Sequence, residues 1–167
     1  GLAEVRFIRA LNYYYLLDGW GNVPFTTAIS SAKPARIQRA DLYKWLIDEL
    51  KNEVEPKLND ASPKTSTTTG YGRVDKAAAW MLLARLYMNA EVYTGTADWA
   101  NAKLYAKKVI DSPYKLYTTK KGQWSAYQQL FMGDNGENGA SVEAIFPILQ
   151  DGLKTTSYGT TLYLMAG

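Results

Sequence analysis

The sequence contains no histidine and no cysteine. Without cysteine there can be no disulfide bond, no thiolate nucleophile and no zinc site of the usual Cys/His type. Without histidine there is no imidazole to act as general base, so the common Ser-His-Asp and Cys-His triads are excluded. The commonest hydrolase chemistries are therefore ruled out by composition alone.

The sequence also has no long apolar run and no block of like charge. No stretch approaches the roughly 20 apolar residues that a membrane-spanning helix needs, and no signal peptide or lipobox cysteine is visible. Nineteen basic and sixteen acidic residues are spread along the chain and give a net charge of +3. Because no basic segment stands out, nucleic-acid binding has little support.

Aromatic residues are plentiful instead. The chain of 167 residues carries thirteen tyrosines and five tryptophans, and 47% of its residues are hydrophobic against 21% charged. This balance is typical of a globular protein, and the length suits one domain with a buried core. Aromatic surface is the main chemical resource that this composition leaves.

The strongest structural signal is an apolar segment at residues 77–84. Its eight consecutive apolar residues include no β-branched one, and alanine, leucine and methionine lose little entropy in a helix. We predict a central helix that is buried nearly all round, with Asp75 near its N-terminal end and Gly95 closing it.

Three further helices are expected around the central one. The second, over residues 41–55, begins with Asp41 as N-cap and stops at Pro56. The last, over residues 97–111, should be an antiparallel neighbour of the central helix because the turn between them is short. The first helix, over residues 3–17, has one apolar stripe at helical spacing: Ala3, Phe7, Ala10, Tyr14 and Leu17.

The pattern changes after residue 113. Residues 114–167 are rich in loops, with a brief helix at 125–131, a loop at 133–139 and a strand within 142–149. We therefore predict a mainly α fold, in which residues 1–113 form antiparallel helix pairs resembling distorted tetratricopeptide units, with a minor β element near the C-terminus. No period near 34 residues recurs, so a regular tetratricopeptide array is not expected.

Three stretches match one known family in the right order. They are residues 3–17 followed by Gly21-Asn22-Val23-Pro24-Phe25, residues 72–90, and Glu143-Ala144-Ile145-Phe146-Pro147-Ile148. The middle stretch reads Gly-Arg-Val-Asp-Lys-Ala-Ala-Ala-Trp-Met-Leu-Leu-Ala-Arg-Leu-Tyr-Met-Asn-Ala. Together they resemble the first helix, the central helix and the following strand of the SusD/RagB family, the surface glycan-binding lipoproteins of Bacteroidetes nutrient-uptake systems.

The resemblance implies a non-catalytic protein that binds an oligosaccharide or polysaccharide and delivers it to a SusC-like TonB-dependent transporter. Such proteins sit on the extracellular face of the outer membrane through a lipid anchor, and their helical units serve chiefly as the docking scaffold for the transporter. Family members are much longer than this chain. We therefore expect an internal piece of such a protein, whose anchor lies upstream.

Glycan contacts are expected from aromatic residues in loops, because flat tryptophan and tyrosine faces cover the C–H groups of sugars. Tyr158 is the first candidate, since part of the family's glycan platform comes from loops after the predicted strand, and Trp124 is the second. Other aromatic residues lie in helical patterns and are expected in the core: Tyr14, Trp45, Trp80, Tyr87 and Trp99.

No catalytic residue, metal ligand or cofactor is predicted. Four carboxylates, Asp48, Glu49, Glu53 and Glu55, invite comparison with a glycosidase, but their spacing favours a solvated helix face. Residues 134–138 offer oxygen atoms that calcium could use. They lack the order of an EF-hand loop, so an ordinary Asn/Gly turn is favoured.

Two alternative functions are kept. A tetratricopeptide-like module that binds a peptide partner needs an exposed concave face lined by polar and aromatic residues of the first helices. A fragment of an all-α glycoside hydrolase needs two buried, facing carboxylates. A SusD-like piece should instead leave an apolar patch where the rest of the protein packs.

Overall fold

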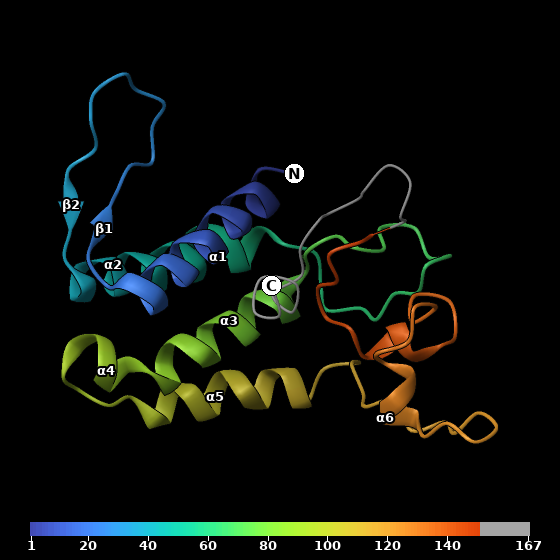
Figure 1. Cartoon of the computed structure of the whole chain (residues 1–167). Coiled ribbons are helices and arrows are strands. Elements are labelled where there is room, and N and C mark those ends of the chain that lie inside the picture. The colour runs from blue at the N-terminus through green and yellow to red at the C-terminus, as the bar shows by residue number, and fades with distance from the viewer. Residues whose placement is uncertain (151–167) are drawn as a thin grey trace, which may run out of the picture.

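The structure is a computed structural model that describes residues 1–150, and it is built mainly of helices (Figure 1). The α-helices and strands of this part are α1 (Leu2–Trp20), β1 (Val23–Pro24), β2 (Arg36–Ile37), α2 (Arg39–Asp48), α3 (Lys76–Met88), α4 (Ala90–Thr94), α5 (Trp99–Ile110) and α6 (Ala126–Gln129). Figure 1 shows α1 and α2 beside each other, with α3 and α5 forming a second pair. The predicted mainly α fold is confirmed.

The first helix is as its apolar stripe predicts. All five stripe residues are buried, and α1 ends at Gly21, whose φ of 72° turns the chain away. The chain then enters β1, which pairs antiparallel with β2 so that Val23 lies opposite Ile37. The loop between these two short strands extends away from the helices (Figure 1).

The second helix covers its predicted range, but it begins at Arg39 and continues through Pro56 to Lys57, and its geometry is not regular throughout. It starts at Arg39, so Asp41 lies in the first turn and is not the N-cap. The α-helical part continues into a π-helical stretch, Glu49–Val54, and a 3₁₀ turn, Glu55–Lys57. Its buried apolar side chains follow one line along the helix: Leu42, Leu46, Leu50 and Val54.

The central helix divides at Asn89 into α3 and α4. Asp75 is the N-cap of α3, where its Oδ1 accepts a hydrogen bond from the N–H of Ala77 at 3.0 Å. Gly95 closes α4 in the left-handed conformation, as predicted. The helix α5 then returns along α3 (Figure 1), and the rings of Tyr87 and Tyr105 stack with centroids 5.6 Å apart.

The predicted strand within residues 142–149 is wrong. Ala140–Glu143 is a 3₁₀ helix instead, and the two strands among residues 1–150 are β1 and β2. The apolar pattern has another cause, because Phe146 packs edge-on against Phe7 of α1, with centroids 5.6 Å apart. The Glu143 carboxylate meanwhile accepts a hydrogen bond from the N–H of Tyr117 at 2.6 Å. The segment therefore packs on helices through single side chains.

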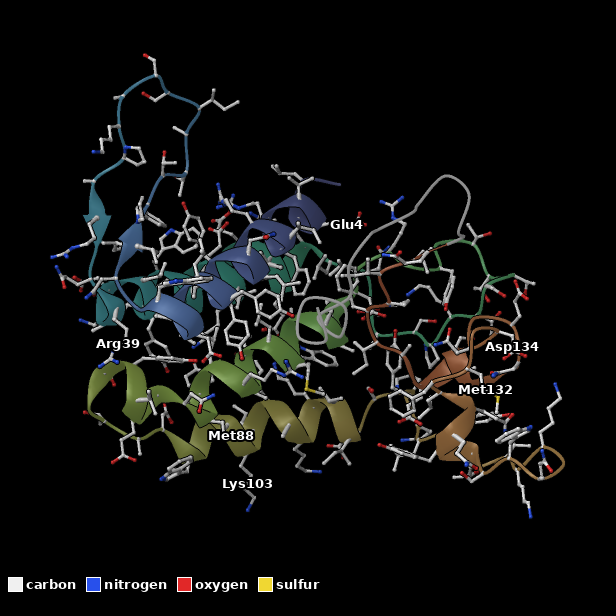
Figure 2. All side chains as sticks on the ribbon, viewed as in Figure 1. Glu4, Arg39, Met88, Lys103, Met132 and Asp134 are labelled. Carbon is white, nitrogen blue, oxygen red and sulfur yellow. The ribbon has the colours of Figure 1, made fainter. Side chains whose placement is uncertain are left out.

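The core positions of the aromatic residues are mostly as predicted. Tyr14 and Tyr87 are buried, and Trp45 and Trp80 are half-buried against the core. Trp99 is an exception: it follows the N-cap Asp98 directly, and its side chain is exposed. Figure 2 shows Lys103 pointing outward from the same helix, whose buried aromatic side is formed by Tyr105.

Candidate functional site

Trp124 lies in a tight turn just before α6. The turn is closed by two backbone hydrogen bonds, from the N–H of Lys121 to the carbonyl of Trp124 at 3.1 Å and in the reverse sense at 3.0 Å. Gly122 adopts a φ of 58° inside it. The Trp124 side chain is 44% exposed, so its ring is partly available to a ligand.

Two more exposed aromatic residues follow Trp124, on α6 and just after it. Tyr127 is 70% and Phe131 72% exposed, and their ring centroids are 5.1 Å apart. Their spacing of four residues places them one helical turn apart. Trp124, Tyr127 and Phe131 are called the α6 aromatic group below. Phe131 is not among the residues that the sequence predicts as glycan contacts, although its i,i+4 relation to Tyr127 is a signal for it.

A buried glutamine holds this part of the chain in place. The side-chain nitrogen of Gln129 donates to the carbonyl of Thr119 at 2.7 Å, and its oxygen accepts from the hydroxyl of Tyr117 at 3.4 Å. Ser125 caps α6 by accepting from the N–H of Gln128 at 3.2 Å. These bonds fix the segment before the helix against α6. The aromatic rings beside them are thereby set on an ordered backbone.

Tyr158, the other predicted glycan contact, lies outside residues 1–150, which the structure describes. The turn at 133–139 does lie within them. There the N–H of Glu137 donates to the Asp134 carbonyl at 2.8 Å, and the Asn138 side chain donates to the Asp134 carboxylate at 3.2 Å. Figure 2 labels Asp134 in this region beyond α6. Within the described ranges, no group of three or more Asp and Glu residues is arranged to hold a metal ion.

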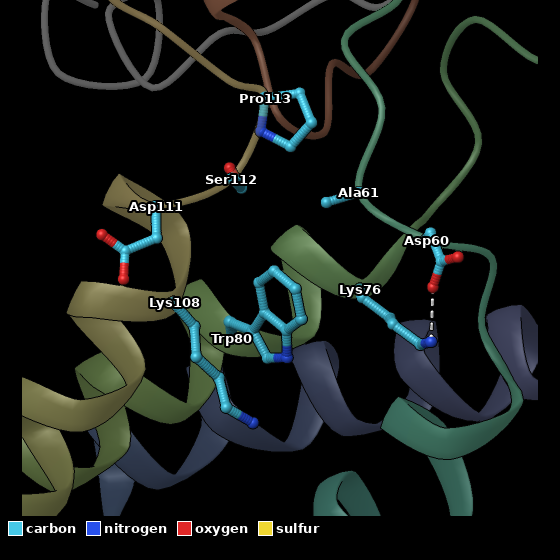
Figure 3. A pocket seen from close by; sticks show the side chains of 8 residues that line it. All are labelled: Asp60, Ala61, Lys76, Trp80, Lys108, Asp111, Ser112 and Pro113. Atoms are coloured by element: carbon cyan, nitrogen blue, oxygen red, sulfur yellow. Dashed lines mark hydrogen bonds and ion pairs between the residues drawn. The ribbon is translucent and has the colours of Figure 1, made fainter.

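A second candidate site is a pocket beside Trp80 with a volume of about 530 Å³ (Figure 3). It lies between the segment after α2, the first half of α3 and the end of α5. The Trp80 Nε1–H donates to the Glu55 carboxylate at 2.7 Å, and Lys108 Nζ donates to the same oxygen at 2.7 Å. Its lining residues are Asp60, Ala61, Lys76, Trp80, Lys108, Asp111, Ser112 and Pro113.

The carboxylate of Glu49 is not solvated, contrary to the prediction. Its side chain is only 5% exposed. The Nε and Nη2 atoms of Arg6 each donate to it at 2.8 Å, and Arg9 donates as well. The Arg6 guanidinium lowers the pKa of Glu49 despite the opposing effect of burial. A general acid needs a raised pKa, so this carboxylate is suited to joining helices and not to proton donation.

None of the helices within residues 1–150 is long and apolar enough to cross a membrane. This finding agrees with the absence of long apolar runs in the sequence.

Known proteins resemble this chain in sequence and in structure, although no protein-family model matches it. Over 166 residues, 99% of the chain, the sequence is 47% identical to a protein named starch-binding protein SusD from Bacteroides thetaiotaomicron. The chain spans 28% of that relative's length. The solved structure of surface glycan-binding protein A from Bacteroides uniformis matches 71% of this chain and 25% of its own, with a TM-score of 0.54 and 28% identity. The resemblance noted in the sequence is confirmed.

Proposed function

Because this chain is SusD-like over nearly all its length, we propose that it is part of a non-catalytic glycan-binding protein. The whole protein binds an oligosaccharide or polysaccharide and delivers it to a SusC-like TonB-dependent transporter. It sits on the extracellular face of the outer membrane through a lipid anchor outside this chain. No cofactor takes part.

The observation that supports this proposal most is the 47% identity to a protein named for starch binding. The α6 aromatic group gives it a physical basis, since it presents three rings on the surface. Stacking on such rings covers the apolar faces of sugar units, while nearby polar side chains bond the hydroxyl groups. Gln123 and Gln128 are exposed and lie next to these residues in sequence. Because the Gln128 side-chain oxygen accepts from the N–H of Ser125 at 2.8 Å, Gln128 offers its amide nitrogen and Gln123 its amide group for that purpose.

The state of the carboxylates supports the non-catalytic part of the proposal. A glycosidase needs one carboxyl group with a raised pKa and a second one facing it. Glu49 instead has a lowered pKa, and its carboxylate accepts three N–H hydrogen bonds from the guanidinium groups of Arg6 and Arg9. Glu55 is bonded to both Trp80 and Lys108. These two carboxylates are engaged by the protein's own side chains.

The proposed division of labour assigns docking to residues 1–113 and sugar contact to residues 114–167. In the second part, Trp124 and Tyr158 are the proposed glycan contacts. The helices of the first part bury their apolar stripes against one another, and they supply a rigid surface for a large partner such as the transporter. On this division, the chain by itself binds sugar weakly.

The test is a calorimetric titration of the chain with maltoheptaose, chosen because the relative is named for starch. We expect weak binding, with a Kd of roughly 1 mM. Trp124→Ala or Tyr158→Ala should weaken it about three- to tenfold, the size of one lost aromatic contact. Trp20→Ala is the matched control, because Trp20 is an exposed tryptophan at the end of α1. Tight binding, or equal loss in the control, would contradict the assignment.

A further inference from the structure

The pocket beside Trp80 lies apart from the α6 aromatic group, and the two share no residue. We propose that this pocket is an additional binding site for one neutral sugar unit of the glycan. The inference rests on the proposed glycan-binding function, but it assigns a site that uses different residues on the helical part of the chain. Three features of the pocket carry it: the fixed indole, the balanced charges of the rim and the unused hydrogen-bonding capacity there.

The indole of Trp80 is held in one orientation before any ligand arrives. Its Nε1–H is bonded to Glu55, and the ammonium of Lys108 stands 5.6 Å from the ring centroid. Figure 3 shows the ring standing between Lys108 and Lys76, with Ala61 and Pro113 across the opening. A ring fixed by its own protein contacts loses little freedom on binding, so stacking against it is favoured.

The rim of the pocket carries charges of both signs that cancel. Asp60 and Asp111 contribute two carboxylates, and Lys76 and Lys108 contribute two ammonium groups. Each of these four groups has an ion partner already: Lys76 with Asp60 at 2.6 Å, Lys108 with Glu55 and Asp111 with Lys107, both at 2.7 Å. A ligand of either sign would disturb these pairs, and so the rim suits a neutral ligand.

The rim also has hydrogen-bonding capacity to spare. Within the described residues, the Lys76 ammonium bonds to Oδ1 of Asp60 alone, and the Asp60 side chain is 91% exposed, with Oδ2 bonded to no residue there. An ammonium group can donate three hydrogen bonds and a carboxylate can accept about four. Sugar hydroxyls both donate and accept, so they can use the remaining capacity of both groups at once.

A peptide side chain fits the same pocket less well. A proline or an aromatic ring would cover the indole, but it would place apolar atoms against the charged groups of the rim and remove water from them. A sugar ring avoids that cost because its apolar faces and its polar edge are separate. The pattern of an apolar floor and a polar rim therefore favours the sugar.

The test is a titration of the full chain with maltoheptaose, followed by NMR of the indole N–H signals of the five tryptophans. Xylohexaose and mannopentaose serve as further neutral probes. We expect the Trp80 signal to shift and saturate with at least one probe. Asp60→Asn should weaken this binding about tenfold, whereas Asp41→Asn, an exposed aspartate paired with Lys44 outside the pocket, should not change it.

The outcomes separate this inference from the proposed function. A Trp124 shift without a Trp80 shift overturns the pocket assignment and leaves glycan binding intact. A Trp80 shift that Trp124→Ala leaves unchanged supports two independent sites. Decaproline is titrated in the same way as a peptide probe. If no sugar moves the Trp80 signal, whether or not decaproline does, the pocket is not a sugar site. Asp60 is exposed, so its substitution should not prevent folding.

Discussion

At the scale of single residues, Asp75 joins three parts of the chain. Its Oδ1 caps α3 through Ala77, and its Oδ2 accepts from the N–H of Ser62 at 3.0 Å and the hydroxyl of Tyr114 at 2.8 Å. Lys64 supplies a counter-charge at 3.2 Å. The carboxylate is almost fully buried, so water could not take its place as the acceptor for these groups.

Asp75→Ala should lower the free energy of unfolding by about 3 kcal/mol, because it removes a helix cap and leaves several buried donors unpaired. Asp98→Ala is the matched control. Asp98 caps α5 by accepting from the N–H of Asn101 at 3.2 Å, but it anchors no second segment among the described residues. The control should cost only about 1 kcal/mol. Urea denaturation of both variants measures the difference, and equal losses would show that Asp75 acts as a cap alone.

What the sequence can predict at this scale is local. Asp75 was recognisable as a residue at a helix start, but its bonds to Ser62 and Tyr114 depend on how two loops fold over α3. The burial of Glu49 escapes a sequence-based prediction for the same reason. Asp48, Lys51 and Asn52 near it are polar, while its partners Arg6 and Arg9 precede it by 43 and 40 residues. Such ion pairs leave no local pattern.

At the scale of elements, periodicity predicted helices well and the strand badly. The stripe of α1 repeats over four turns, and a strand or a loop would not sustain this spacing for so long. The pattern at 142–149 covers too few residues to distinguish a strand from a chain that packs single apolar side chains on helices. The β1–β2 loop also separates α1 from α2, which departs from the tight turn of a tetratricopeptide unit.

Substitutions of two glycines test the backbone conformation at the ends of α1 and α4. Gly95 has a φ of 82° and no atom close to where a side chain would begin, so Gly95→Ala should cost about 1 kcal/mol through the backbone alone. Gly19 lies within α1 and has equal space around it, so Gly19→Ala should stabilise the protein by about 0.5 kcal/mol. Thermal unfolding gives both values. Changes of the same sign would refute the assigned conformation of Gly95.

At the scale of the whole molecule, residues 114–150 contact the helical part near both of their ends. Tyr114 bonds to Asp75, Phe146 packs on Phe7, and Leu149 lies so close to Gly72 that a side chain there would meet it at 2.8 Å. The apolar core itself is drawn almost entirely from the helices between Ala3 and Tyr105. We therefore predict that the parts of the chain before and after residue 113 differ in local stability, as they do in sequence pattern.

Native-state hydrogen exchange tests this division. Amides of α1, α3 and α5 should exchange only through global unfolding, because these helices carry the shared core. Amides of residues 118–124 should exchange at least about a hundredfold faster, since this segment is exposed and has few backbone hydrogen bonds. Phe146→Ala should speed exchange in residues 140–150 and leave the helices unchanged. Equal protection of the amides on both sides of residue 113 would contradict this prediction, because it would show that the two parts unfold as one cooperative unit.

The candidate sites were predictable to different degrees. Trp124 could be selected from the sequence because it lies in a loop-rich segment with other aromatic residues. The pocket beside Trp80 could not, since its rim combines Asp60, Lys76 and Lys108, which come together only when α5 and the segment after α2 both pack on α3. A tryptophan within a helical pattern is usually a core residue, and half-burial becomes visible only in three dimensions.

The π-helical stretch at Glu49–Val54 gives the second helix room for a chain one residue shorter. A π-helix closes its hydrogen bonds over one residue more than an α-helix, so the six residues of this stretch turn the chain about as far as five residues of a regular α-helix would. Deleting one residue there should restore a regular helix and leave Glu55 close to Trp80 and Lys108. Single-residue gaps in homologous sequences should therefore be commoner at these positions than within α1 or α3.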